Sequence, residues 1–236
     1  MKIAILLPYK ENFSPEYPGA VSLFVNETSK ISRYKKNIIV FGNTNYKKKY
    51  KLKYLNINLL KNPLISQTKE YVNKFSRIQK KYNFSLIEVH NRPRYINKLH
   101  KYNKNLVLYY HNDPLDLKGS KSINDRLNLI KKTKKIIFIS KWVKSRFLEG
   151  INKKYLLENK FNIIQHSTNK KIVDFKKKEK IILFVGRLNK SKGYDIFGKV
   201  LLNILNKFPD WKSVVIGDEP RERLVFKHKN LKVLGF

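Results

Sequence analysis

Two cations and two glycines follow a buried-type apolar run in the second half of the chain. Residues 181–185 are Ile-Ile-Leu-Phe-Val, and Gly186 and Arg187 come next, with Lys192 and Gly193 a few residues later. Arginine can bind a phosphate through two parallel hydrogen bonds, and lysine acts on it as a point charge. Glycine lets the backbone turn sharply and come close to a ligand. These residue types in this order predict a site for a phosphorylated ligand.

The neighbouring elements would place these charges where ligands usually bind. An amphipathic stretch at 195–207 follows the glycine, so the segment is typical of a strand, a loop and a helix. Ligands of open α/β sheets bind beyond the carboxyl ends of the strands, and we expect the first amides and positive end of the helix to face the same place. The pattern is neither a Walker loop nor a G-x-G-x-x-G turn. On composition alone, the favoured interpretation is a loop that carries cations because the whole chain is rich in them.

Apolar runs alternate with amphipathic stretches along the whole chain. The predicted strands are 3–8, 37–42, 54–57, 85–90, 106–110, 136–139, 162–165, 181–185, 213–217 and 231–234. The predicted helices are 21–33, 67–82, 124–132, 141–149 and 195–207. Most of the strands are continuously apolar, which is typical of strands covered on both faces. This alternation predicts an α/β fold with parallel sheets.

A polar, lysine-rich segment at 167–180 separates two sets of elements. About seven predicted strands precede it, enough for a doubly wound sheet, and only three follow it. We therefore expect an N-terminal Rossmann-like domain over 1–170 and a partial C-terminal Rossmann-like domain over 179–236.

The composition is strongly basic, with 52 Lys and Arg, 17 Asp and Glu and a net charge of +35. Nucleic-acid binding is one interpretation of such a charge. The other is a genome rich in A and T, since Lys, Asn, Ile, Tyr and Phe are abundant and the lysines are scattered along the whole chain. No helix-turn-helix, RRM or OB signature is present, so we expect no specific nucleic-acid partner. The charge should favour peripheral contact with anionic membrane surfaces.

The remaining composition restricts the class of protein. The chain has no cysteine, which excludes disulfides and cysteine-ligated metal centres and fits a reducing compartment. No apolar run approaches the ~18 residues that suggest a membrane span. The first residues are typical of a strand and not of a secretion signal. We expect a cytoplasmic protein, in peripheral contact with the inner face of the membrane.

The stretches ILFVGRLNKSKGYDIF and WKSVVIGDEP resemble the start of the C-terminal domain of retaining nucleotide-sugar glycosyltransferases. That family, group 1 or family four, has two Rossmann-like domains in the arrangement called GT-B. Its pattern is Gly-Arg-Leu after a strand, then Lys-Gly before a helix, then Gly-Asp-Gly-Pro after the next strand. Here Glu219 replaces the last glycine, and we expect its side chain to crowd the nucleotide. The resemblance implies an α/β fold of two Rossmann-like parallel-sheet domains, the second incomplete.

The N-terminal half is similar to the same family at several points. LLPYKENFSPEYPGAVSLFVNETSK resembles its opening strand, loop and first helix, with Gly19 at the start of the helix. LVLYYHNDP resembles the strand that ends in a histidine, here His111, and IIFISKWVKSRF resembles a strand, a serine N-cap and a helix. NIIQHST stands where the family has an Asn-Gly-Val-Asp hinge and does not match it well.

The resemblance implies a role for each matching residue. His111 would be the catalytic residue that contacts the donor sugar, and no metal or cofactor is required beside the two cations. The residues expected to bind the donor phosphates are Arg187, Lys192 and Gly19, and those expected at the nucleotide are Gly186, Gly217 and Asp218. For four further residues on the same rim, structural hydrogen bonding is the favoured interpretation: His90, Asn91, Arg92 and Asp113.

The implied activity is metal-independent transfer of a sugar from a nucleotide-diphosphate donor, with retained anomeric configuration. The expected partners are the nucleotide sugar and a glycan or lipid-linked acceptor of the lipopolysaccharide or cell-surface polysaccharide class. One alternative is a truncated, non-catalytic remnant, because the family's pair of glutamates belongs to a region beyond residue 236. The other alternative is a basic nucleic-acid-binding protein.

Overall fold

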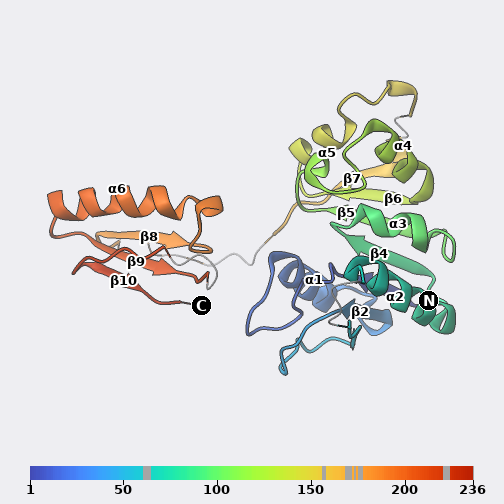
Figure 1. Cartoon of the computed structure of the whole chain (residues 1–236), viewed down its shortest axis with the longest axis horizontal. Coiled ribbons are helices and arrows are strands. Elements are labelled where there is room, and N and C mark those ends of the chain that lie inside the picture. Colours follow the sequence, from blue (N-terminus) through green and yellow to red (C-terminus); the bar gives the residue numbers. More distant parts are fainter. Residues whose placement is uncertain are drawn as a thin grey trace. The chain divides into compact units, whose positions relative to one another are not determined.

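The computed structural model describes residues 1–60, 65–155, 158–167, 172, 174, 178–219 and 224–235. The chain divides into two compact units, Met1–Thr168 and Asn169–Phe236. Each unit is built on its own parallel sheet, of seven strands in the first and three in the second (Figure 1). The predicted fold class, α/β with two Rossmann-like parallel sheets, is confirmed.

The first sheet has the strand order β3-β2-β1-β4-β5-β6-β7, and every neighbouring pair is parallel. Its strands are β1 Ile3–Leu6, β2 Ile38–Gly42, β3 Tyr54–Asn56, β4 Leu86–His90, β5 Leu106–Tyr110, β6 Lys135–Phe138 and β7 Phe161–Ile163. The order reverses between β1 and β4, which creates the switch point beside which doubly wound sheets bind ligands.

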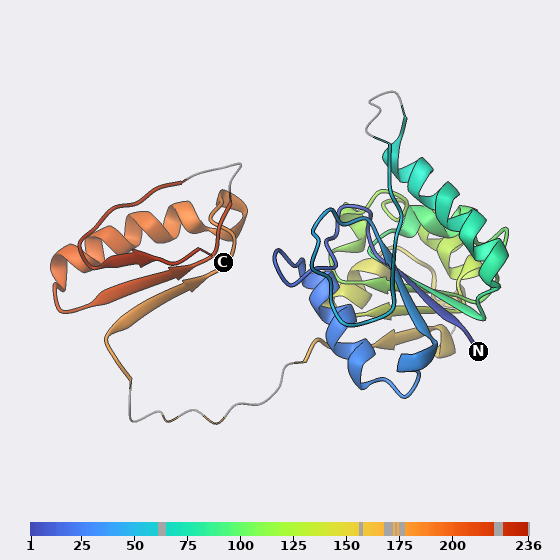
Figure 2. The ribbon, with the colours of Figure 1, turned by 90° about the horizontal axis from the view of Figure 1, so that it is seen from below.

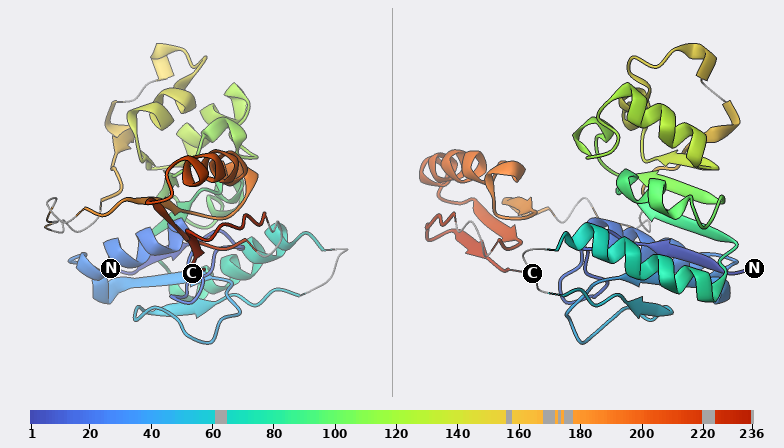
Figure 3. Two further views of the ribbon diagram at one scale, coloured as in Figure 1. Left: turned by 90° about the vertical axis from the view of Figure 1, so that its left-hand side faces the viewer. Right: turned by 45° about the vertical axis from the view of Figure 1, so that its right-hand side comes forward.

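Helices cover both faces of this sheet. They are α1 Ala20–Ile31, α2 Gln67–Tyr82, α3 Pro93–Leu99, α4 Ile123–Lys132 and α5 Lys141–Leu148, with short 3₁₀ helices η1 Lys35–Asn37, η2 Pro114–Asp116, η3 Lys153–Tyr155 and η4 Glu158–Lys160. Helix α1 packs on one face in a core that contains Ile5 and Val40. Helices α2 to α5 share the opposite core with Ala4 and Leu6 (Figure 3). Successive residues of β1 thus enter different cores, which explains its continuous apolar sequence.

One helix of this unit was not predicted. Helix α3 begins at Pro93, directly after Arg92, in a segment whose polar residues indicated a rim loop. Proline is favoured in the first turn of a helix, because that position needs no amide donor. The predicted N-cap at Ser140 is confirmed, since its hydroxyl accepts a hydrogen bond of 3.1 Å from the Val143 amide.

The face covered by α1 becomes polar where β4 and β5 meet. Ile87 and Val89 of β4 point into the core shared by α2 to α5. Glu88 and His90 alternate with them and therefore belong to the face that α1 covers. This polar patch forms the candidate site of the first unit.

The second unit contains β8 Ile181–Val185, β9 Lys212–Ile216 and β10 Leu231–Val233, in the order β10-β9-β8. Helix α6 Tyr194–Lys207, preceded by the 3₁₀ helix η6 Lys190–Lys192, lies along one face of this sheet (Figure 2). On the other face, Leu183 and Val185 are 57% and 67% exposed. The expectation that β8 is covered on both faces is therefore wrong for the part of the chain that the structure describes.

Candidate active site

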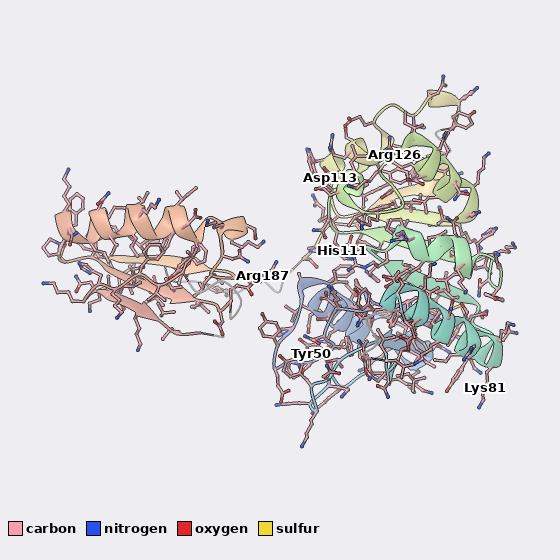
Figure 4. The ribbon with its side chains drawn as sticks, viewed as in Figure 1. Tyr50, Lys81, His111, Asp113, Arg126 and Arg187 are labelled. Atoms are coloured by element: carbon pink, nitrogen blue, oxygen red, sulfur yellow. The ribbon has the colours of Figure 1, made fainter. Side chains whose placement is uncertain are left out.

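Arg187 lies at the carboxyl end of β8, as the sequence predicts (Figure 4). Its side chain is 48% exposed, and its Nη1 lies 3.9 Å from a carboxylate oxygen of Glu219, which is only 2% exposed. The same oxygen accepts a hydrogen bond of 3.2 Å from the side-chain amide of Asn189. The predicted phosphate-binding cation therefore already has an anionic neighbour, because Glu219 replaces the glycine of the family pattern.

The turn between Arg187 and α6 is closed by Asn189. Its side-chain oxygen accepts a hydrogen bond from the Lys192 amide (3.2 Å), and its carbonyl accepts one from the Tyr194 amide (3.2 Å). The Gly193 amide donates to the carbonyl of Lys190. The amides of residues 192–194 therefore bond within the turn, and the expectation that the first amides of the helix face a ligand is not met by Tyr194, its first residue. The side chain of Lys192 is exposed, so it is the part of this residue that could meet a ligand. Gly193 adopts a φ of +71°, a backbone conformation that favours glycine.

Gly186 and Gly217 lie in direct contact where β8 and β9 end. A Cβ atom on Gly217 would lie 1.8 Å from the carbonyl oxygen of Gly186, so only glycine fits at residue 217. The Gly217 amide donates to Gly235 (2.8 Å), and Asp218 is exposed after it. The two glycines thus hold the strand ends together, and their role at a nucleotide stays a prediction.

Gly19 is the N-cap of α1, but another side chain occupies the helix terminus. The Glu11 carboxylate accepts a hydrogen bond of 3.0 Å from the Ser22 amide in the first turn. A Cβ atom on Gly19 would lie 1.9 Å from Glu11 Oε1. The carboxylate therefore takes the place where the sequence predicts a donor phosphate. Glu11 was not among the predicted site residues, because an acidic residue in the loop before a helix is a weak signal.

His111 lies just beyond β5, within a row of titratable side chains (Figure 4). His90 Nε2 is 2.6 Å from a carboxylate oxygen of Glu88, and His90 Nδ1 is 2.8 Å from His111 Nε2. His111 Nδ1 is in turn 2.8 Å from Nε2 of His166, which follows β7. Both ring nitrogens of His111 are therefore hydrogen-bonded to other histidines. The structure thus brings three of the five histidines together, which the sequence did not predict.

Aromatic rings hold this histidine row in place. Tyr109 stacks on His111 at 4.7 Å between ring centroids, and its hydroxyl donates a hydrogen bond of 2.8 Å to the carbonyl of Ile164. Phe24 of α1 stacks on His166 at 4.7 Å. Helix α1, which begins after Gly19, therefore lies beside the histidine row.

Burial also lowers the pKa of two members of the row, His111 and His166. Desolvation, and then the neighbouring His90 and His166, lower the pKa of His111 to about 2. Desolvation followed by His90 lowers the pKa of His166. His111 is therefore neutral at pH 7, when it can both donate and accept one hydrogen bond.

The other rim residues make structural hydrogen bonds, as predicted. Asn91 accepts a hydrogen bond of 2.8 Å from the His111 amide. Asp113 accepts from the Leu115 amide (2.9 Å) and from Arg146 Nε (3.0 Å). The hydrogen bond that Arg146 donates to Asp113 is the main cause that raises the pKa of Arg146. Arg92 donates to the carbonyl of Asn91, so these residues order the loops that follow β4 and β5.

The candidate residues fall in both units. Gly19 and His111 belong to the first, and the second contains Arg187, Lys192, Gly186, Gly217 and Asp218. The described residues contain no group of three or more histidine or acidic side chains that could hold a metal ion. None of the helices in the described ranges has the length and apolar character of a membrane span.

Comparisons with known proteins give one family and several similar folds. Residues 165–234 match the family described as glycosyl transferases group 1. A sequence search of curated proteins finds no match. Among solved structures, a lipopolysaccharide outer core galactosyltransferase, WaaB, is similar with a TM-score of 0.56 at 19% identity. WaaG, a glycosyltransferase involved in lipopolysaccharide biosynthesis, gives 0.61 at 12%, and a sucrose-phosphate synthase from Thermosynechococcus elongatus gives 0.65 at 13%.

These structures match both units of the chain. The matches cover 93% of this chain and 62% of WaaB, 98% and 70% for WaaG, and 100% and 70% for the sucrose-phosphate synthase. The chain thus has the α/β fold of these GT-B structures and spans about two thirds of their length. At such identities the likeness establishes the fold, and the chemistry has to be argued from the sites.

Proposed function

We propose that the protein is a glycosyltransferase of group 1 that uses a nucleotide-diphosphate sugar as donor. The observation that carries this proposal is the segment after β8. It lies inside the range that matches the family, and it places Arg187 and Lys192 on one short turn beyond the carboxyl end of a parallel strand. Sugar transfer breaks the bond between the anomeric carbon and the diphosphate, so negative charge grows on the leaving phosphate. Preorganised cations at that position stabilise the transition state.

The class of acceptor is inferred from the names of the similar structures. WaaB and WaaG are named for lipopolysaccharide synthesis, and we propose an acceptor of that class for this chain, a cell-surface glycan or a lipid-linked precursor. Transfer without a metal is proposed because the two cations can neutralise the diphosphate. Retention of the anomeric configuration rests on the sequence resemblance alone. The role of His111 at the sugar stays a prediction.

The test is a calorimetric titration of UDP and GDP into the full chain and its Arg187→Ala variant. A charge-assisted hydrogen bond contributes about 1.5–3 kcal/mol, so the variant should bind about 10- to 150-fold more weakly. Lys199→Ala is the matched control, because Lys199 is an exposed cation on α6 and its loss changes the net charge equally. Equal weakening by both variants would indicate unspecific attraction to the basic chain. No binding of either nucleotide by folded protein would contradict the proposal and favour the non-catalytic remnant.

A further inference from the structure

A groove runs along helix α3 of the first unit, where α3 contacts both α2 and α4. It consists of a hollow of 490 Å³ between these three helices and a smaller one of 190 Å³ at the loops that follow β4 and β5. The two hollows adjoin, because Thr68, Arg94 and Tyr95 line both of them. We call the pair the α3 groove. The larger hollow has the size of a small-molecule site, about 300–1,000 Å³.

The lining of the α3 groove has an excess of positive charge. Its cations are Lys69, Arg92, Arg94, Lys98 and Lys118, and its carboxylates are Asp116 and Asp125. None of these cations forms an ion pair with a carboxylate of the described residues. Lysine is common everywhere in this chain, which has 43 lysines but only nine arginines. Two of these nine arginines lie here, two residues apart, so composition explains the lysines better than it explains this pair.

Gly119 fixes the position of Arg94 in the groove. It adopts a φ of +94°, and a Cβ atom on it would lie 2.6 Å from Cγ of Arg94 and 3.1 Å from the Arg94 amide nitrogen. Glycine therefore lets the stem of Arg94 lie against the loop that precedes α4. No acceptor within the described part of the chain takes a hydrogen bond from the Arg94 guanidinium. Its five N–H donors remain available to a ligand.

Two asparagines add further donors to the groove. A lysine ammonium can only donate hydrogen bonds. Lys98 donates to Oδ1 of Asn73, and Lys132 donates to Oδ1 of Asn97 over 2.8 Å. The side-chain oxygens of both asparagines therefore face lysines, and their amide nitrogens are left for acceptor atoms of a ligand. This lining suits a ligand that is rich in acceptor atoms and negatively charged.

The groove fits a charged saccharide better than a nucleic acid. Proteins bind single-stranded nucleic acids by stacking the bases on aromatic side chains. Tyr95 is the one aromatic residue among the described lining residues, and it is fully buried. Cations beside amide donors instead match a phosphate or carboxylate beside the hydroxyl and ring oxygens of a sugar. One end of the groove reaches Asn91, just beyond β4, and thus the edge of the sheet where such folds bind ligands.

We propose that the α3 groove binds a phosphorylated or carboxylated saccharide. Arg94 binds the anionic group, and the amide nitrogens of Asn73 and Asn97 bind neighbouring sugar oxygens. The groove is argued from residues of the first unit alone. Only the assignment of this saccharide to the acceptor rests on the proposed function, and it narrows the acceptor to glycans that carry such a group.

The test is a calorimetric titration of trehalose 6-phosphate and of digalacturonate into the full chain, with trehalose and inorganic phosphate as references. We expect a charged saccharide to bind more tightly than either reference. Arg94→Ala should weaken its binding about tenfold, the lower share of a charge-assisted hydrogen bond, and leave the binding of UDP or GDP unchanged. Asn97→Ala should weaken it about fivefold and leave inorganic phosphate unchanged. Arg33→Ala is the matched control, because Arg33 is an exposed arginine that follows α1, outside the groove.

Several results would overturn the proposal. Folded protein that binds neither charged saccharide would do so, as would equal weakening by Arg94→Ala and Arg33→Ala, the sign of unspecific attraction. Inorganic phosphate that binds as tightly as the saccharides would leave a site for an anion alone. A short oligothymidylate that displaces the saccharide and loses affinity in Arg94→Ala would assign the groove to nucleic acid. If a charged saccharide binds through Arg94 but neither UDP nor GDP binds, the proposed function fails and the saccharide site stands.

Discussion

Glu219 should weaken the binding of a diphosphate beside Arg187, and replacing it by glutamine should reverse this effect. Its carboxylate is buried and lies 3.9 Å from the guanidinium. A phosphate about 3 Å beyond the guanidinium would lie about 7 Å from this charge. At an effective dielectric constant of about 40, between surface and bulk values, the repulsion is about 1 kcal/mol. This energy corresponds to about a sixfold change in Kd.

The assay is a titration of UDP or GDP, whichever binds, into the full chain and its Glu219→Gln variant at low salt. Glutamine retains an oxygen that can accept from Asn189, and it removes the charge. Asp210→Asn is the control, because it changes the net charge by the same amount in the same unit, where Asp210 pairs with Lys180 before β8 and β9 begin. We expect about sixfold tighter binding for Glu219→Gln and less than about a twofold gain for the control, since salt screens distant charges.

Two results would refute this reasoning. An equal gain in both variants would show that only net charge matters. Weaker binding by Glu219→Gln would show that the carboxylate orients Arg187 for the ligand, so that its positioning effect exceeds its repulsion.

Two further predictions concern stability. Gly217→Ala should destabilise the second unit by about 3 kcal/mol, because the new methyl group would clash with the Gly186 carbonyl. Gly193→Ala should destabilise it by about 1 kcal/mol, because the left-handed backbone conformation is unfavourable for alanine although no atom lies near the new methyl group. Calorimetric melting of both variants checks this, and equal losses would rule out the steric cause. Because folding holds the pKa of His111 near 2, the unfolded chain binds an extra proton below pH 6.5, so the free energy of unfolding should fall by about 2 kcal/mol between pH 7.5 and 5. Denaturant titrations should show a smaller fall for His111→Phe; an unchanged fall would assign it to other groups.

The sequence predicted the elements better than the contacts between them. The apolar runs of β5 and β8 and the amphipathic period of α2 were located to the residue, because such patterns are local. Helix α3 was missed because it begins at a proline after a polar segment and is only seven residues long. The exposure of one face of β8 among the described residues could not be anticipated, since a continuous apolar run does not reveal how many layers cover it.

In the candidate sites, too, the sequence predicted what depends on local order and missed what depends on contacts between distant residues. The position of Arg187 after its strand follows from local order alone. The histidine row depends on the register of β4 against β5 and on the path of the chain after β7, which no local pattern encodes. Its one readable signal was the alternation of Glu88 and His90 with apolar residues inside a strand. The carboxylates beside Gly19 and Arg187 are likewise non-local, although Glu219 already departed from the family pattern.

The side of the three-stranded sheet that no described residue covers has a consequence for handling the protein in solution. Leu183 and Val185 offer an apolar surface to other copies, while the net charge of +35 makes these copies repel one another. The Debye length shrinks from about 30 Å at 0.01 M to 3 Å at 1 M salt, and sulfate also strengthens apolar association. Light scattering should therefore show self-association that grows with ammonium sulfate, and dialysis into dilute buffer should reverse it.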